Sequence, residues 1–303
     1  AGRLRTATAY PADSTFGVSP GDPFWDTHAV DLLTAVVRHV RAAPYADRVF
    51  AWLPCAFNTN EWFLRTFVPG ATCDFSAPAQ RAFRAWLRRQ GCDDAPARPV
   101  PSPGACQAAG HGEFLDPAHP EARRVEEFSR WLNRRIGDII LSFARTIKGL
   151  YPERPPLVGA FYGYTTELSR FQNLSQSGHL DLARVLSSPD IDFLCSPCQY
   201  FYRRDEGPFT YSQVLGPFSC AAADLGKLAY LEDDHPPADY RGTGPDLTTR
   251  DAWHDEMFFR RNFAQVASHG QQLWLYSLGA GWLKEPRRQA IVARLHQVGL
   301  EAQ

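Results

Sequence analysis

Short apolar runs alternate with amphipathic stretches along this chain. The runs are almost continuously apolar, which is typical of parallel strands buried on both faces. They predict strands at 3–10, 48–57, 156–164, 191–200, 227–234 and 272–278. Between them, apolar residues recur at helical spacing and predict helices at 26–43, 125–151 and 250–270. Asp26 is the expected N-cap of the first of these helices, and Gly270 ends the last.

The alternation of strands and helices predicts an α/β fold, either doubly wound or a (β/α)8 TIM barrel. No GxGxxG or Walker-type glycine pattern follows a strand, which argues against a dinucleotide or phosphate site. Instead, polar and aromatic residues follow several successive strands, as they do at the catalytic face of a barrel. These residues are Asn60, Glu61, Tyr162, Tyr164, Tyr200, Glu232, Asp234, Trp274 and Trp282. We therefore predict the barrel.

The predicted strands number six rather than eight. We expect a single TIM-barrel domain over 1–303 that lacks the first two β/α units, so that strands three to eight are present. The alternative is that two strands escape detection. A Pro/Gly/Ala-rich stretch at 92–114 predicts a long surface loop within the domain. The sequence leaves open whether an upstream segment, a second chain such as another copy in a homo-oligomer, or nothing completes the barrel.

Composition narrows the classes of partner. The chain has 303 residues, 44% of them apolar, and a formal net charge of −1, so no global field favours nucleic acid. No apolar run is long enough to span a membrane, and no signal-peptide pattern is found. Cys195 and Cys198 form an isolated CxxC, and His254 and His269 lack metal-site spacing, so no metal or other cofactor is predicted. The sequence does not identify the cellular compartment.

Two glutamates, each at or just after the end of a predicted strand, form a candidate catalytic pair. Glu61 follows the second predicted strand, and Glu232 ends the fifth. In a barrel, two such positions face one another across the mouth. A retaining glycosidase uses two carboxyl groups about 5 to 5.5 Å apart, one as nucleophile and one as acid/base. The sequence therefore predicts a carbohydrate substrate.

Asn60 directly before Glu61, with a second glutamate three strands later, resembles the clan A glycoside hydrolases. Within that clan the chain is most similar to family 42 β-galactosidases and their uncharacterised relatives. The similarity covers roughly 45–285 and is carried by "NTNEWF", "CDFSAPAQRAFRAWLRRQG", "VGAFYGY", "IDFLCSPCQYFYRR" and "KLAYLEDD". It implies that Glu61 is the acid/base, that Glu232 is the nucleophile, and that Asn60 holds the sugar 2-hydroxyl.

The resemblance also implies roles for aromatic residues. Tyr162 or Tyr164 would hydrogen-bond the nucleophile, and Trp274 or Trp282 would stack on a sugar face. Trp62, Tyr200 and Asp234 are further candidates for sugar contacts. The zinc-binding cysteine cluster of some family 42 members is not recognisable, and "EDDHPP" places two more acids beside Glu232. The sequence thus predicts a retaining β-glycosidase, and the alternative is a carbohydrate-binding or structural barrel without turnover.

Overall fold

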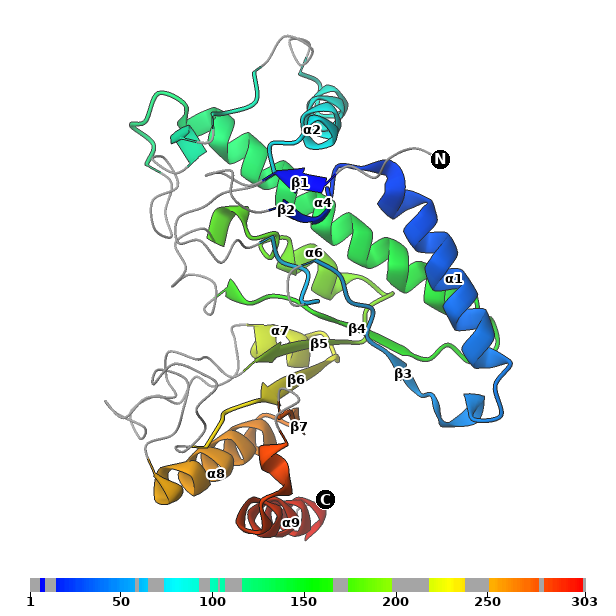
Figure 1. Cartoon of the computed structure of the whole chain (residues 1–303), viewed down its shortest axis with the longest axis vertical. Coiled ribbons are helices and arrows are strands. Elements are labelled where there is room, and N and C mark those ends of the chain that lie inside the picture. Colours follow the sequence, from blue (N-terminus) through cyan, green and yellow to red (C-terminus); the bar gives the residue numbers. More distant parts are fainter. Residues whose placement is uncertain are drawn as a thin grey trace. The chain divides into compact units, whose positions relative to one another are not determined.

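Figure 1 shows the computed structural model of the chain, which divides into two compact units, Ala1–Asp192 and Phe193–Gln303. The structure describes residues 6–8, 15–57, 60–64, 74–92, 99–102, 104–106, 116–165, 174–197, 218–237, 251–277 and 281–301.

The first unit contains a short antiparallel hairpin, a parallel strand pair and helices that cover it. Its strands are β1 (Thr6–Thr8), β2 (Thr15–Val18), β3 (Ala51–Trp52) and β4 (Leu157–Phe161). Its helices are η1 (Pro23–Asp26), α1 (His28–Arg41), η2 (Ala46–Arg48), α2 (Ala77–Arg89), α4 (Ala122–Gly149), η3 (Leu174–Gln176) and α6 (Leu182–Ser187).

Helix α4 is the centre of the first unit's core. Phe128, Leu132, Ile136 and Ile140 recur at helical spacing and are completely buried. The helix contacts α1, α2, α6 and β4, and Figure 1 shows α1 lying along it. A bidentate ion pair from Arg135 to Asp26, at 2.9 Å, ties α4 to η1. This helix therefore supports the loops that follow β3 and β4.

Strands β3 and β4 are parallel, with Ala51 in register with Leu157 and Trp52 with Val158. Strand β4 is nearly continuously buried, as its apolar sequence predicts. Asp192 continues the hydrogen bonding along β4, because its N–H donates to the Val158 carbonyl and its carboxylate accepts from the Val158 N–H, both at 2.7 Å. Lys148 of α4 binds the same carboxylate at 2.9 Å.

The second unit repeats the strand–helix pattern. It contains β5 (Phe193–Pro197), α7 (Phe218–Asp224), β6 (Leu228–Asp233), α8 (Ala252–Ser268), β7 (Gln272–Leu275), η5 (Trp282–Lys284) and α9 (Pro286–Glu301). Strand β6 pairs in parallel with β5 and with β7. Helix α8 begins at the Asp251 cap, whose carboxylate accepts from the His254 N–H at 2.9 Å. It covers one face of the strands, where Leu231, Val266 and Leu273 pack together.

Several details differ from the predictions made from sequence. The strand predicted at 48–57 is confirmed only over Ala51–Trp52, and β2 was not predicted. The strand predicted at 3–10 is confirmed only over Thr6–Thr8, and it pairs antiparallel with β2 rather than in a parallel sheet. An apolar run indicates a strand but does not identify its partner. Asp26 does not cap α1, because it closes η1 and Thr27 occupies the N-cap position. In the stretch 92–114, the described residues 104–106 form a helical turn.

Candidate functional site

Glu61 lies in a tight loop after β3. The Trp62 N–H donates to the Ala56 carbonyl at 2.9 Å and closes the loop. Phe57, Asn60 and Trp62 all have φ between 64° and 67°, in the left-handed region. Asparagine tolerates this conformation, but each bulky residue there costs on the order of 1–3 kcal/mol. Strain of this kind is typical of functional loops, and here it flanks the candidate acid/base.

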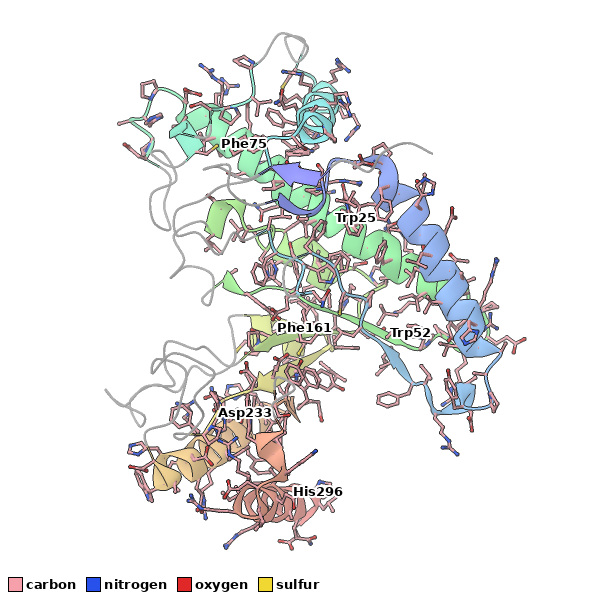
Figure 2. All side chains as sticks on the ribbon, in the orientation of Figure 1. Trp25, Trp52, Phe75, Phe161, Asp233 and His296 are labelled. Atoms are coloured by element: carbon pink, nitrogen blue, oxygen red, sulfur yellow. The ribbon has the colours of Figure 1, made fainter. Side chains whose placement is uncertain are left out.

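Aromatic packing holds the strained loop in place. Trp62 is fully buried, and its indole N–H donates to the Pro54 carbonyl at 2.9 Å. Its ring packs edge-on against Phe143 of α4, with ring centroids 5.7 Å apart. Phe57 packs against Trp25, which Figure 2 labels beside α4, at 4.6 Å. Trp62 thus supports Glu61 from the core and offers no exposed ring surface to a sugar.

Tyr164 is the hydrogen-bond partner of the Glu61 carboxyl group. It is buried three residues beyond the end of β4, and its hydroxyl donates to Glu61 Oε1 at 3.0 Å. The sequence predicted a tyrosine on the nucleophile, whereas this bond is to the predicted acid/base. Glu61 itself is half-buried and Asn60 is exposed, so both side chains are accessible from solvent.

A buried histidine that the sequence reading did not single out joins these two loops. His179 Nδ1 accepts from the main-chain N–H groups of Gly163 and Tyr164, both at 3.1 Å. Its Nε2 lies 2.9 Å from the Glu61 carbonyl oxygen. Complete burial lowers the pKa of His179 to about 3, although the bond to Glu61 opposes the shift. The imidazole is therefore neutral at ordinary pH.

Tyr162 supports the same region without facing outward. It is completely buried, and its hydroxyl donates to the Gly178 carbonyl at 2.8 Å and accepts from the Asp181 N–H at 3.1 Å. Burial raises the pKa of this phenol far above its usual range. Its ring stacks on the His179 ring with centroids 4.7 Å apart. Tyr162 therefore fixes the segment that carries His179.

In the second unit, Glu232 lies at the end of β6 and is buried. It is in register with Trp274 of β7, so the two side chains project to the same face of the parallel strands. Trp274 and Tyr276 are partly exposed, and their rings stack almost in parallel with centroids 5.5 Å apart. The pair is an aromatic surface on the Glu232 face of the sheet.

A buried ionic network follows Glu232 on the opposite face. Asp233, labelled in Figure 2, binds His235 Nδ1. His235 Nε2 lies 3.3 Å from the Asp255 carboxylate on α8, and Arg288 of α9 forms a bidentate ion pair with the same carboxylate. Arg288 also donates to the His235 carbonyl at 3.2 Å. The network links the end of β6 to α8 and α9.

Charge, rather than burial, decides the ionisation of this network. Burial acts to lower the pKa of His235, but the charge and hydrogen bond of Asp233 raise it overall. For Asp255, burial acts to raise the pKa, but His235 and Arg288 lower it overall. The carboxylates of Asp233 and Asp255, on either side of the His235 ring, therefore favour its protonated form.

The other predicted residues are distributed as follows. Asp234 is completely buried, and Trp282 is buried at the start of η5, after Gly281 in the left-handed conformation. Tyr200 and Cys198 lie outside the described residues. Among the residues that the structure describes, no group of three or more His, Cys, Asp or Glu is arranged to hold a metal ion. Over the same residues, no helix is long and apolar enough to cross a membrane.

The structure brings Glu61, Tyr162 and Tyr164 into contact with His179, and Asn60 directly precedes Glu61. It places Glu232, Asp234 and Trp274 on neighbouring strand ends of the second unit. The sequence reading missed His179, Tyr276, Asp255 and Arg288. Only Tyr276 carried a signal, because its spacing of two from Trp274 places both rings on one face of a strand.

Comparison with known proteins identifies the fold class. No family model matches the chain, and no curated protein matches it. Among solved structures, the catalytic domain of β-amylase from Paenibacillus polymyxa is similar, with a TM-score of 0.59 and 12% sequence identity over 95% of this chain and 73% of that chain. Together with the parallel strands and their helices, this likeness defines the fold as an incomplete (β/α) barrel. The predicted fold class is thereby confirmed.

Proposed function

We propose that this chain is a retaining glycoside hydrolase that cleaves a β-linked sugar, with β-galactosides as the first candidates. The observation that carries the proposal is the Tyr164–Glu61 hydrogen bond, made in a strained loop that follows a parallel strand. Glycosidase chemistry is in keeping with the fold, which the chain shares with the catalytic domain of an amylase. Strain and a preset hydroxyl partner both favour a chemical role for Glu61.

In this mechanism Glu232 attacks the anomeric carbon while Glu61 donates its proton to the departing glycosidic oxygen. The bond to the aglycone breaks as the glycosyl–Glu232 ester forms. Glu61, now ionised, then removes a proton from water, whose oxygen attacks the same carbon and releases Glu232. No redox partner or metal enters this cycle. Asn60, exposed next to Glu61, is the candidate partner of the sugar 2-hydroxyl.

Sugar binding is assigned to the aromatic surface of β7. Trp274 and Tyr276 are stacked and partly exposed on the Glu232 face, so an apolar sugar face can pack against either ring. Trp282 is buried and is not assigned a sugar contact, and Tyr200 stays a sequence-based candidate. Trp62, Tyr162 and Asp234 are not assigned sugar contacts, because their side chains are buried.

The test uses Glu61→Ala and Glu232→Ala with an aryl β-glycoside whose leaving group departs without protonation. With sodium azide present, Glu232→Ala should give the glycosyl azide of inverted configuration, because azide replaces the nucleophile. Glu61→Ala should give the azide of retained configuration, because azide intercepts the glycosyl–enzyme in place of activated water. NMR of the anomeric proton distinguishes the two products and so assigns the two roles.

Without azide, Glu61→Gln should lower kcat on an alkyl glycoside roughly 10²- to 10⁴-fold. Glu232→Gln should lower it by roughly 10³-fold or more. The matched control is Glu153→Gln, at an exposed position before β4, which should leave kcat unchanged. If the natural chain hydrolyses no α- or β-glycoside in a broad panel but binds sugars by calorimetry, the non-catalytic barrel replaces this proposal.

A further inference from the structure

The tautomer of His179 follows from its partners. Nδ1 faces two N–H donors, from Gly163 and Tyr164, and can accept from them only if it carries no proton. The ring proton must then be on Nε2, which donates it to the Glu61 carbonyl oxygen 2.9 Å away. One neutral imidazole thus hydrogen-bonds the main chain of Glu61 and the main chain of its hydroxyl partner, Tyr164.

The segment that carries His179 is held from several directions. The Ser177 carbonyl accepts from the Leu64 N–H at 2.9 Å, just beyond the Glu61 loop. The Leu180 N–H donates to the Asn133 side chain of α4 at 2.7 Å. Gly178 has φ of 96°, and a Cβ there would lie 2.8 Å from Ile136 of α4 and 3.4 Å from the Trp62 carbonyl oxygen. The imidazole therefore has little freedom to move.

We propose that His179 is a positioning residue, which sets the place of the Glu61 carboxyl group through its three main-chain hydrogen bonds, two at Nδ1 and one at Nε2. This inference rests on the function proposed above. The Glu61 loop is strained at Phe57 and Trp62, so it needs external bonds to keep one conformation. His179 hydrogen-bonds both that loop and the main chain just after β4, where the Tyr164 side chain extends to donate to Glu61 Oε1.

A neutral ring suits this position better than a charged one. A cation at hydrogen-bond distance from Glu61 would favour the ionised carboxylate and oppose proton donation. The donors on Gly163 and Tyr164 exclude a proton from Nδ1, so His179 orients Glu61 without adding a charge. A lysine or arginine could replace the donor to the Glu61 carbonyl but not the acceptor, and it would bring a charge.

Two substitutions separate the two halves of the ring. In His179→Asn the side-chain oxygen takes the place of Nδ1 and keeps the acceptor, but the donor to Glu61 is lost. In His179→Gln the amide nitrogen takes the place of Nε2 and keeps the donor, but the acceptor is lost. His39→Asn and His39→Gln, on the exposed face of α1, are matched controls. All variants are assayed well below their thermal midpoints.

The readout is the dependence of kcat/KM on the leaving group, because kcat/KM reports the step that forms the glycosyl–Glu232 ester whichever step limits kcat. A displaced general acid should lower kcat/KM roughly 10- to 10²-fold on an alkyl β-glycoside. It should have a much smaller effect on kcat/KM for a dinitrophenyl β-glycoside, whose departure needs no proton. His179→Asn should show the larger loss, because it removes the bond to Glu61 itself. The His39 controls should match the natural chain on both substrates.

Equal losses on both substrates, or no loss, would overturn the positioning role if Glu61→Gln still shows its leaving-group dependence. If Glu61→Gln itself is fully active, the proposed function fails first, and the two failures are thereby distinguished. A second measurement needs no variant to fold: ¹⁵N NMR of the natural chain, labelled at histidine, should report a neutral Nε2–H tautomer for His179 from pH 8 to 5. Protonation at Nδ1 would also overturn the inference.

Discussion

In the unit Ala1–Asp192 the imidazole that binds the main chain of Glu61 has a lowered pKa, whereas in Phe193–Gln303 the imidazole that follows Glu232 has a raised pKa. Both rings are completely shielded from water, and burial acts to lower both pKa values. The hydrogen-bond partners of the His179 ring are two main-chain N–H groups and a main-chain carbonyl, none of which carries a negative charge that would stabilise an imidazolium. His235 lies between the carboxylates of Asp233 and Asp255, and their effect on its pKa outweighs that of burial.

The difference shows that, for two equally buried histidines, the hydrogen-bond partners decide whether the pKa is lowered or raised. It also matches the roles proposed for the two glutamates. An acid/base must exchange a proton, and His179 orients Glu61 without a charge that would fix its ionisation. Behind Glu232, a balanced set of charges ties the end of β6 to α8 and α9.

The largest expected effect is the loss of the network's central carboxylate. Asp255→Ala would leave Arg288, which has no exposed surface, and His235 without their shared counter-charge. We expect the free energy of unfolding to fall by about 3 to 5 kcal/mol in urea titrations, because uncompensated buried charges are costly. Asp47→Ala, at an exposed position in η2, is the control and should change stability by less than about 0.5 kcal/mol. A loss of under about 1 kcal/mol for Asp255→Ala would contradict a buried ion network.

The two histidines should respond to pH in opposite senses. The pKa of His179 is about 3 in the folded chain and near 6.5 when unfolded, so below pH 6.5 the unfolded state binds the extra proton. Stability from His179 is therefore full above pH 6.5 and falls by about 1.4 kcal/mol per pH unit as the pH drops toward 3. Because the pKa of His235 is raised, its contribution is full below pH 6.5 and is lost as the pH rises through the folded value.

Urea titrations of the natural chain, His179→Asn and His235→Asn from pH 4 to pH 9 measure both effects. The difference in unfolding free energy between the natural chain and His179→Asn should shrink toward acid, by roughly 3 kcal/mol between pH 6.5 and pH 4. The corresponding difference for His235→Asn should shrink toward alkali. Taking differences removes the titration of carboxylates common to all three chains. If the two differences instead shrank toward the same end of the pH range, the pKa values of the two rings would be shifted in the same direction, which would contradict the comparison.

The sequence predicted the elements on which both sites lie, but not the contacts between them. Apolar runs identified β4, β5, β6 and β7, and the polar residues after them indicated Glu61 and Glu232. His179 could not be predicted, because it occupies a short Ser/Gly segment and its partners are main-chain atoms 15 to 118 residues away. Main-chain hydrogen bonds leave no residue-type signature in a single sequence. Likewise, Asp255 and Arg288 meet only because α8 and α9 pack against each other.

The smallest expected effect on stability is that of removing the hydroxyl group that binds the Glu61 carboxyl group. Tyr164→Phe removes the hydroxyl that donates to Glu61 Oε1 at 3.0 Å. Glu61 is half-buried, so water can replace the donor, and we expect the unfolding free energy to fall by only about 0.5 to 1.5 kcal/mol. A hydrogen bond to a carboxylate stabilises its ionised form, so its loss should raise the pKa of Glu61.

In the pH profile of kcat/KM for an alkyl glycoside, this change should move the alkaline limb, which reports the acid/base, to higher pH. Tyr45→Phe, at an exposed tyrosine before η2, is the control and should leave both limbs in place. A shift of the acidic limb alone would assign Tyr164 to the nucleophile, as the sequence suggested. The profile therefore decides which of the two glutamates this hydroxyl serves.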